Sequence, residues 1–453
     1  MNFHRLAVFC VCWAVSSSEM QRPEDDPDKD ALRYDGFVVL EMTLTSDLQV
    51  KLLTDLKEEV RRKEEHGTTT IEEWTGSINK ERPFSLLLAP KVAPDVLMLC
   101  HKEGIQYEIV WNDLQSVIDL QNAEAVSSSK TDRDDGIAAQ TSGMTWARYH
   151  RYSTIERYIL ALPVVHPDLV TIERLGLTYE GRQVWVVKLG KPRSDGIKKP
   201  AIWLDAGIHA REWISSATVT FMLNELVTKY TSDPIIRRLV DQVDFYVVPM
   251  VNPDGFEFTH QKERLFRKTR RVNPFNACIG VDANRNYDFQ WQTERAELRP
   301  CEITFGGDFP YSEPENRALF EKVLDLKGDL KSFITFHSHS QLWMLPYGYT
   351  FDLTPDDAVV RDLAVNATNA LRALYGTVFR VGTSPEILYT SSGTSRDFAK
   401  GRTQIKYVYT VELRDTGEFG FLLPAEQILP SGLETFEGVK VIALRIIEEF
   451  ARN

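Results

Sequence analysis

From about residue 144 to the end of the chain, short apolar segments alternate with long helical ones, and this alternation restricts the possible fold more than any other feature. The predicted buried strands are RQVWVVKLG, PAIWLDAG, VDFYVVPMV, LKSFITFHS and IKYVYTVEL. The predicted helices include EWISSATVTFMLNELVTKY and PENRALFEKVLDLK. Strands that alternate with helices predict an α/β fold, a doubly wound mixed sheet with helices on both faces.

A smaller unit precedes this region, at about residues 34–112. Its predicted strands are GFVVLEMTL, FSLLLAP and IQYEIVW. Its predicted helices are SDLQVKLLTDLKEEVRRKE, which Ser46 caps, and APDVLMLCHKEG, which ends at Gly104. This mixture of strands and helices indicates a small α+β domain.

A predicted helix, NDLQSVIDLQNAEA, and a linker, AVSSSKTDRDDGIAAQTSG, connect the two units. The linker consists of small and polar residues and contains Lys130 and Arg133. Basic residues in an exposed linker are open to a trypsin-like protease. We therefore expect such a protease to be a partner of this chain and to cut after Lys130 or Arg133.

The first residues have the order of a secretory signal peptide. A basic start, MNFHR, is followed by the apolar run LAVFCVCWAV and then by the small residues SSSE. The apolar run is too short to cross a bilayer, which takes about 20 residues. We expect cleavage near Ser18, secretion into the extracellular space and no membrane anchor.

Overall charge excludes two classes of function. The chain of 453 residues carries 53 Lys and Arg against 65 Asp and Glu, a net charge of −12. A protein that neutralises nucleic-acid phosphates or anionic lipids needs a basic surface. We therefore expect neither nucleic acid nor a membrane among the partners.

Cysteine positions fit the secretory route. Once Cys10 and Cys12 leave with the signal peptide, Cys100, Cys278 and Cys301 remain. A disulfide between Cys278 and Cys301 would close a loop of about 24 residues and stabilise the fold by roughly 3 kcal/mol. Three free thiols are the alternative, which an oxidising compartment disfavours.

Chemically reactive residues follow the predicted strands. His209 and Glu212 come directly after PAIWLDAG, and their spacing lets both reach one ion from a single turn. His337 ends SFITF, and a short spacer with a distant third ligand is typical of catalytic zinc sites. Glu412 ends KYVYTVEL and is available as a general base for an attacking water. The sequence therefore predicts one Zn²⁺ per chain.

The motif His-x-x-Glu is weak when it stands alone, but its neighbours strengthen it. Asn284 and Arg285 lie in VDANRNY, Arg264 and Arg267 lie in ERLFRK, and Tyr389 follows later. Side chains of these kinds hold carboxylates at two points.

Six motifs together resemble the secreted zinc metallocarboxypeptidases of the A/B type. They are GIHAREWIS, VNPDGFEFTH, RLFRK, GVDANRNYDF, FHSHSQLWMLPYGY and VELRDTGEFGFLLP. The resemblance covers essentially the whole chain. It implies removal of the C-terminal residue from peptides and proteins, one zinc, an inhibitory pro-segment of ferredoxin-like fold, and activation by cleavage in the connecting segment.

We place the domain boundaries accordingly at a signal peptide of residues 1–18, an activation pro-segment of residues 19–133 and a catalytic domain of residues 134–453. We expect a monomer.

The resemblance also implies roles for single residues. The implied zinc ligands are His209, Glu212 and His337. Glu412 takes the position of the base, and Arg267 the position that polarises the scissile carbonyl. The implied substrate-binding residues are Asn284, Arg285, Tyr389, Arg211, Arg396 and Phe421. Asn284, Arg285 and Tyr389 would grip the terminal carboxylate, and Asp282 would accept a hydrogen bond from a zinc-bound imidazole.

Two positions depart from the family pattern. His339 stands where the family most often has Tyr, and it either shapes the subsites upstream of the cleaved bond or packs as a neutral imidazole. Arg396 falls at the floor of the side-chain pocket, where the A type is apolar and the B type has Asp. A guanidinium there should pair with a C-terminal Glu or Asp, as in carboxypeptidase O and the glutamate-preferring insect enzymes.

Other interpretations remain open from the sequence alone. Arg396 could fold back onto Asp397 or turn to solvent, which would leave an A-like preference for aromatic and aliphatic termini. A relative that only binds peptides would lack a ligand or the base, whereas this chain has them all. Asn366 begins a glycosylation sequon whose occupancy cannot be predicted.

Overall fold

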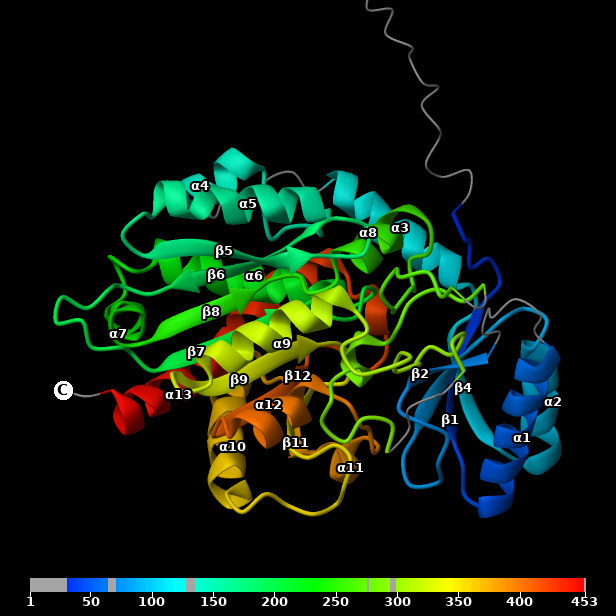
Figure 1. Cartoon of the computed structure of the whole chain (residues 1–453). Helices are drawn as coiled ribbons and strands as arrows, with labels where there is room; N and C mark the ends of the chain where they lie inside the picture. Colours follow the sequence, from blue (N-terminus) through cyan, green and yellow to red (C-terminus); the bar gives the residue numbers. More distant parts are fainter. Residues whose placement is uncertain (1–30, 64–70, 128–134, 275–276, 294–298, 452–453) are drawn as a thin grey trace, which may run out of the picture.

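The computed structural model describes residues 31–63, 71–127, 135–274, 277–293 and 299–451. Within these ranges the chain forms a four-stranded and an eight-stranded β-sheet (Figure 1). None of the helices in this part of the chain is long and apolar enough to span a membrane. The predicted signal peptide, Lys130 and Arg133 lie outside the described residues.

The small sheet is entirely antiparallel and has the strand order β2-β3-β1-β4. Its strands are β1 (Val38–Thr43), β2 (Ile71–Thr75), β3 (Phe84–Leu88) and β4 (Gln106–Trp111). Helices α1 (Asp47–Lys63) and α2 (Ala93–Glu103) pack together over a core that includes Leu53 and Val96. As predicted, Ser46 caps the start of α1, because its hydroxyl accepts from the Gln49 amide, and Gly104 ends α2 with a φ of 62°.

Strand β2 was not predicted, and neither was a short helix in the expected linker. Strand β2 carries adjacent glutamates and has an irregular register between Glu73 and Thr75, so only Ile71 and Trp74 are buried and no alternating pattern results. The expected linker also contains a short helix, α4 (Gly136–Ser142). Ala138 and Ala139 are buried residues of α4. Because small residues are also typical of linkers, the sequence did not distinguish this helix from a linker.

The large sheet is mixed and has the strand order β11-β10-β12-β9-β7-β8-β6-β5. Its strands are β5 (Val170–Leu177), β6 (Gln183–Leu189), β7 (Ala201–Ala206), β8 (Asp244–Val248), β9 (Leu330–His337), β10 (Leu342–Leu345), β11 (Arg380–Thr383) and β12 (Tyr407–Glu412). The central strands β12, β9, β7 and β8 are parallel to one another. This confirms the predicted doubly wound mixed sheet.

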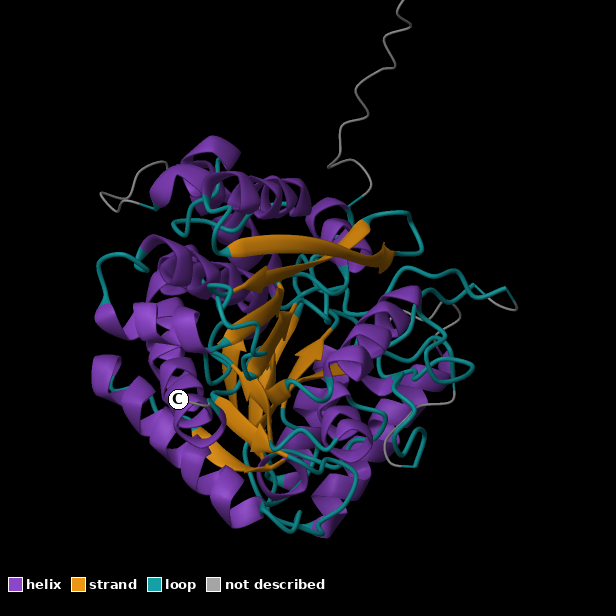
Figure 2. Cartoon of the chain, turned by 60° about the vertical axis from the view of Figure 1, so that its left-hand side comes forward, coloured by secondary structure: helices purple, strands orange, loops and turns teal. Residues whose placement is uncertain are grey.

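Helices cover both faces of the large sheet (Figure 2). They are α5 (Tyr152–Val165), α6 (Trp213–Thr228), α7 (Pro234–Gln242), α8 (Pro253–Gln261), α9 (Pro314–Leu326), α10 (Asp357–Tyr375), α11 (Ser384–Ile387), α12 (Ser395–Thr403) and α13 (Ile428–Phe450). Three short 3₁₀ turns are η1 (Ala283–Arg285), η2 (Gly420–Leu422) and η3 (Ala425–Gln427).

Alternate residues of β7 face two separate hydrophobic cores. Ile202 and Leu204 belong to a core shared with α5, α6, α10 and α13. Trp203 belongs to the opposite core, which includes residues of α9 and α12. Because side chains alternate across a strand, burial on both faces requires the continuous apolar runs that the sequence shows.

The small sheet packs over the carboxyl ends of the parallel strands of the large sheet (Figure 1). A fourth core joins the two units and includes Trp74 from β2, Val117 from α3 (Leu114–Ser127) and Phe421 from η2. Polar contacts add to it, because Trp111 donates to the Glu418 carbonyl at 2.5 Å. The N-terminal unit therefore covers the carboxyl ends of β7, β9 and β12, where the predicted site residues lie.

Candidate functional site

The ends of three parallel strands position the predicted metal ligands and base. His337 is the last residue of β9 and pairs in register with Glu412, the last residue of β12. His209 follows β7, and Glu212 immediately precedes α6. Ligands commonly bind beyond the carboxyl ends of strands in sheets of this type.

His209, Glu212 and His337 form a compact buried cluster. One Glu212 carboxylate oxygen lies 2.8 Å from Nδ1 of His209, and the other lies 3.0 Å from Nδ1 of His337. The two Nδ1 atoms are 3.0 Å apart, and a suitable donor atom from each residue lies within 4.8 Å of the others. Two imidazoles and one carboxylate are the donor set that Zn²⁺ takes in catalytic sites, so these residues fit a zinc ion.

Asp282 fixes the orientation of His209 and Arg267. It lies 3.1 Å from Nε2 of His209, which leaves Nδ1 directed toward the cluster. The guanidinium of Arg267 donates to Asp282 through two nitrogens, at 3.1 and 2.9 Å. Burial alone would raise the pKa of Asp282, but Arg267 and His209 hold it well below its usual range. The carboxylate is therefore charged and holds both partners in place.

Glu412 has an environment suited to proton transfer. Burial raises the pKa of its carboxyl to about 7, although the neighbouring His337 opposes the shift. A general base works best when its pKa lies near the operating pH. Glu412 also lines the cavity described next, so a water in that cavity can reach it.

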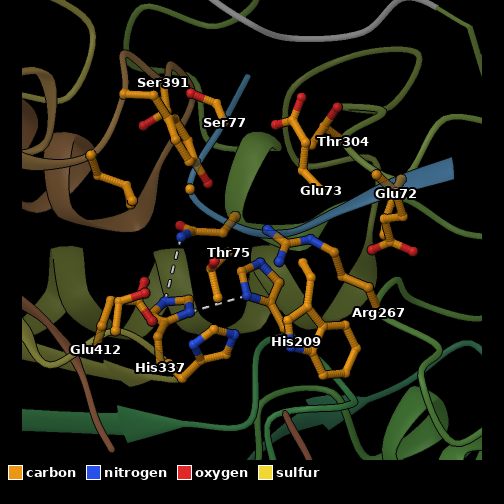
Figure 3. A pocket seen from close by; sticks show the side chains of 18 of the residues that line it. Glu72, Glu73, Thr75, Ser77, His209, Arg267, Thr304, His337, Ser391 and Glu412 are labelled. Carbon is orange, nitrogen blue, oxygen red and sulfur yellow. Dashed lines mark hydrogen bonds between the residues drawn. The ribbon is translucent and has the colours of Figure 1, made fainter. Parts of the chain in front are cut away.

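A cavity of about 430 Å³ collects the predicted residues (Figure 3). It is lined by His209, Glu212, His337, Glu412, Arg267, Asn284, Arg285, Tyr389, Arg211, Arg396 and Phe421. Figure 3 shows Glu412 beside His337, with β2 passing over the pair of histidines. The structure thus brings every predicted metal, catalytic and substrate residue to one site.

Asn284 and Arg285, two of the residues predicted to hold a carboxylate, are buried at the cavity wall. Oδ1 of Asn284 accepts from the Ser395 amide at 2.9 Å, which orients the side chain. Arg285 donates through Nη1 to the Asn284 carbonyl at 2.9 Å, and among the described residues its buried Nε has no hydrogen-bond partner. A bound anion would satisfy this group.

Arg396 lies against the backbone of Gly348 at the predicted pocket floor. Its Nε donates to Asp397 at 3.1 Å, and Asp397 also accepts from the Gly348 amide at 3.0 and 2.9 Å. A Cβ added to Gly348 would come within 2.1 Å of Nη2 of Arg396, so only glycine leaves room for the guanidinium. Among the described residues, Nη1 and Nη2 make no hydrogen bond. Arg396 is 3% exposed and therefore does not turn to solvent.

His339 packs within an aromatic group. Its ring centroid is 4.9 Å from that of Phe421 and 6.4 Å from that of Trp74. Its pKa is lowered, chiefly by burial, and its Nδ1 has no hydrogen-bond partner among the described residues.

The N-terminal unit contributes lining residues that sequence reasoning missed, foremost Glu72 and Trp74 on β2. Glu72 accepts from Nη1 of Arg211 at 2.6 Å, and the Trp74 ring lies edge-on to Phe421 with centroids 5.2 Å apart. The sequence did not mark these two residues as part of the site, because a glutamate and a tryptophan in a short polar segment show no periodicity that indicates an interface.

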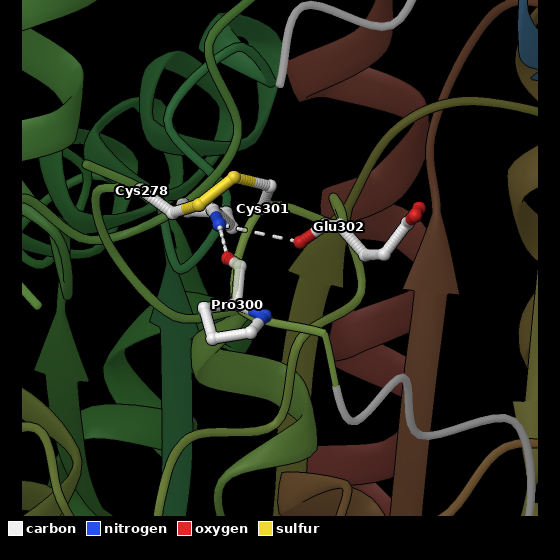
Figure 4. The surroundings of a disulfide bond; sticks show 5 residues. Cys278, Pro300, Cys301 and Glu302 are labelled. Carbon is white, nitrogen blue, oxygen red and sulfur yellow. Dashed lines mark hydrogen bonds between the residues drawn. A yellow bond between two sulfur atoms is a disulfide. The ribbon is translucent and has the colours of Figure 1, made fainter. Parts of the chain in front are cut away.

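The expected disulfide is present (Figure 4). Cys278 and Cys301 are bonded, with Cα atoms 4.8 Å apart, while Cys100 is a buried free thiol whose pKa burial raises to about 11. Lys268 donates to the carbonyls of Pro300 and Glu302 beside the disulfide, at 2.8 and 3.2 Å. These bonds anchor the loop that supplies the cavity residues Ile303 and Thr304.

Comparison with known proteins agrees with this geometry. The family model described as zinc carboxypeptidase matches residues 155–438, and the model described as carboxypeptidase activation peptide matches residues 40–121. A carboxypeptidase B of Astacus astacus is 46% identical over 302 residues, which are 66% of this chain and 97% of that protein. Carboxypeptidase A1 of Bos taurus is 36% identical over 407 residues, 90% of this chain and 93% of that protein.

Solved structures are similar as well. The crystal structure of thrombin-activatable fibrinolysis inhibitor matches with a TM-score of 0.80 at 27% identity and covers 92% of this chain and 100% of that chain. The fold, the cavity and the family matches agree, and this chain belongs to the zinc carboxypeptidase family, with the carboxypeptidase activation peptide on its N-terminal side.

Proposed function

We propose that this chain is the secreted zymogen of a zinc carboxypeptidase that releases acidic C-terminal residues. The observation that carries the acidic preference is the buried Arg396 guanidinium, whose terminal nitrogens make no hydrogen bond within the described residues. A carboxylate at the end of a substrate side chain would pair with them. A site built for such a pair rejects side chains that leave it unmatched, by up to several orders of magnitude.

His209, Glu212 and His337 are the residues that would hold the metal. Zn²⁺ bound there would supply Lewis acidity, which would polarise a carbonyl and lower the pKa of a nearby water. Asp282 keeps the His209 ring in the orientation that binding requires.

The chain's own residues account for the proton transfers and the charge that develops. Glu412 accepts a proton from the attacking water and returns it to the leaving amine, and a pKa of about 7 suits both directions. Arg267 stabilises negative charge on the former carbonyl oxygen, because Asp282 holds its guanidinium in place before the substrate arrives.

Selection of a chain end requires a clamp for the terminal carboxylate. Asn284, Arg285 and Tyr389 are the residues for this clamp, and the unpartnered Nε of Arg285 supports it. With the carboxylate bound there, the terminal side chain extends toward Arg396. Gly348 and Ser391, both small, lie beside the guanidinium at this end of the cavity.

Activation follows from the arrangement of the two units. Because the described part of the N-terminal unit covers the cavity, cleavage by a trypsin-like protease after Lys130 or Arg133 would separate the pro-segment, residues 19–133, from the catalytic domain, residues 134–453. Secretion rests on the signal-like residues 1–18, and we expect the activated protein to be a monomer.

An A-like preference for aromatic and aliphatic termini is the second candidate. The contact between Nε of Arg396 and Asp397 favours it, because Asp397 partly neutralises the guanidinium. Matched blocked dipeptides that end in Glu or Gln separate the two. We expect a kcat/KM ratio of Glu to Gln above about 10, the factor that corresponds to one charge-assisted hydrogen bond. A ratio near 1 would reject acidic specificity.

A further inference from the structure

The two histidines of the candidate zinc cluster differ in what supports their outer nitrogens. Both direct Nδ1 toward Glu212, at 2.8 Å for His209 and 3.0 Å for His337. Nε2 of His209 lies 3.1 Å from the Asp282 carboxylate. In the described part of the chain, the only carboxylate within 4.0 Å of the His337 ring is that of Glu212, on the Nδ1 side. Nε2 of His337 therefore needs another kind of partner.

Two polar atoms lie near Nε2 of His337. Nδ2 of Asn284 is 3.4 Å away, and Oγ1 of Thr335 is 3.5 Å away. Because Oδ1 of Asn284 accepts from the Ser395 amide, its Nδ2 faces the ring, and this nitrogen can only donate. An imidazole that binds a metal through one nitrogen carries its proton on the other and donates it to an acceptor. The Thr335 hydroxyl oxygen is the acceptor within reach.

Asp205 orients that hydroxyl. The Thr335 hydroxyl donates to Oδ1 of Asp205 at 2.7 Å, which leaves the lone pairs of its oxygen for Nε2 of His337. Oδ2 of Asp205 accepts from Nε1 of Trp203, also at 2.7 Å. Burial raises the pKa of Asp205 to about 6, against the effect of these two hydrogen bonds, so the carboxyl is mostly charged above that pH. A chain of bonds thus runs from a buried charge to the outer nitrogen of His337.

This chain of bonds belongs to the catalytic unit alone. Asp205 and Thr335 are register partners on the adjacent parallel strands β7 and β9, and they are 1% and 0% exposed. Neither residue lines the cavity that the N-terminal unit covers. Cleavage of the pro-segment therefore removes none of the contacts that make up this chain.

We propose that Thr335 and Asp205 are positioning residues for the metal, which act through His337. They hold the His337 ring in the orientation and the tautomer that present Nδ1 to zinc, as Asp282 does for His209. The proposal rests on the zinc site proposed above. A purely structural role is the alternative, because the bond between Thr335 and Asp205 also joins two strands.

Zinc affinity distinguishes the two roles. The dissociation constant of the full chain is measured by competition with a chelator of known affinity. Thr335→Val has nearly the same shape without the hydroxyl, and we expect its dissociation constant to rise about 10-fold to 100-fold, the usual effect of losing a partner of a metal ligand. Thr335→Ser restores the hydroxyl and should stay within about threefold of the unmodified protein.

Thr410→Val is the matched control. Thr410 is the register partner of Thr335 on the other neighbouring strand, β12, and within the described residues its hydroxyl bonds to neither histidine. Its loss should leave the zinc affinity unchanged. Urea unfolding of the zinc-free proteins measures any effect on the strands themselves, separately from the effect on the metal.

Two results would overturn the proposal: unchanged zinc affinity in Thr335→Val, whatever its stability, or weak binding that Thr335→Ser does not restore. If Thr335→Val does not fold, Asp205→Asn decides, because it removes the charge at the end of the chain of bonds. We expect it to bind zinc about tenfold more weakly, and unchanged affinity would again refute the proposal. An unmodified chain that takes up no zinc would instead reject the zinc site itself, and this inference with it.

Discussion

Glu412 and His337 are register partners on the adjacent parallel strands β12 and β9, so the candidate base and a candidate zinc ligand are set side by side by backbone pairing. Glu412 nevertheless contributes no atom to the three-residue ligand cluster. Pairing of the strands therefore fixes where the candidate base lies relative to the candidate ligands.

Replacement of the base should separate turnover from metal binding. We predict that Glu412→Gln lowers kcat by about 100-fold to 10,000-fold, the usual contribution of general base catalysis, while the protein keeps one zinc per chain. Metal content is measured by mass spectrometry of the activated protein. His337→Gln, which removes a ligand, should lose the zinc as the comparison variant. Near-normal turnover by Glu412→Gln would show that another group acts as the base.

The charge at the pocket floor should decide terminal specificity. Arg396→Asp replaces the guanidinium at the pocket floor by a carboxylate, and we predict that preference then moves from terminal Glu to terminal Lys and Arg. Arg396→Met, which has a similar length without charge, should lose the preference for Glu without gaining one for Lys. The measurement is kcat/KM on blocked dipeptides with these termini. An unchanged order of preference in both variants would show that Arg396 does not determine terminal specificity.

The disulfide should stabilise the catalytic domain. The bond between Cys278 and Cys301 closes a loop of about 24 residues, so its loss is expected to lower the free energy of unfolding by about 3 kcal/mol. Urea unfolding of the activated double variant Cys278→Ala/Cys301→Ala measures this. Reductant should destabilise the unmodified protein and leave the double variant unaffected. Equal midpoints for the two proteins without reductant would refute a stabilising role.

Glu315 should make stability depend on pH. Burial, with smaller contributions from Glu313 and Asp254, raises the pKa of its carboxyl from 4.5 to about 8. The folded state then holds a proton that the unfolded state releases, so stability is full below about pH 4.5 and falls as pH rises toward about 8.

We therefore predict that Glu315→Gln, which can still accept from the Tyr179 amide, loses less stability than the unmodified protein between pH 5 and pH 8. Urea midpoints across this range provide the measurement. Parallel pH profiles for the two proteins would mean that Glu315 is ionised in the folded state.

Strands β5, β10 and β11 were not predicted, because most side chains of β5 are not buried and β10 and β11 have only four residues each. Strands β6, β7, β8, β9 and β12 could be predicted from sequence, because most of their side chains are buried on both faces of the sheet. Continuous apolar runs such as AIWLDA mark those strands, and His209, His337 and Glu412 follow directly where the runs end. Strand β2 could not be predicted in the same way, since all five of its residues line the cavity beside the other unit and a register irregularity breaks the alternation.

The pairing of Glu72 with Arg211 joins residues 139 positions apart and has no local signal. The sequence likewise left the conformation of Arg396 undecided. Its position depends on Asp397 and Gly348, and only the folded pocket brings the segment of Gly348 next to the segment of Arg396 and Asp397. Motifs identified the chemistry of the site, whereas tertiary packing determined which charges lie opposite one another.

Release of terminal residues by the activated protein tests the central claim most directly. Blocked dipeptides that end in Glu, Phe or Lys are incubated with the protease-activated chain, with and without a chelator and with zinc added back. We predict that Glu is released at least about tenfold faster than Phe or Lys, the effect of a charge-assisted hydrogen bond, and that the chelator stops release until zinc returns. Release of Phe more than tenfold faster than Glu, or release that the chelator does not affect, would contradict it.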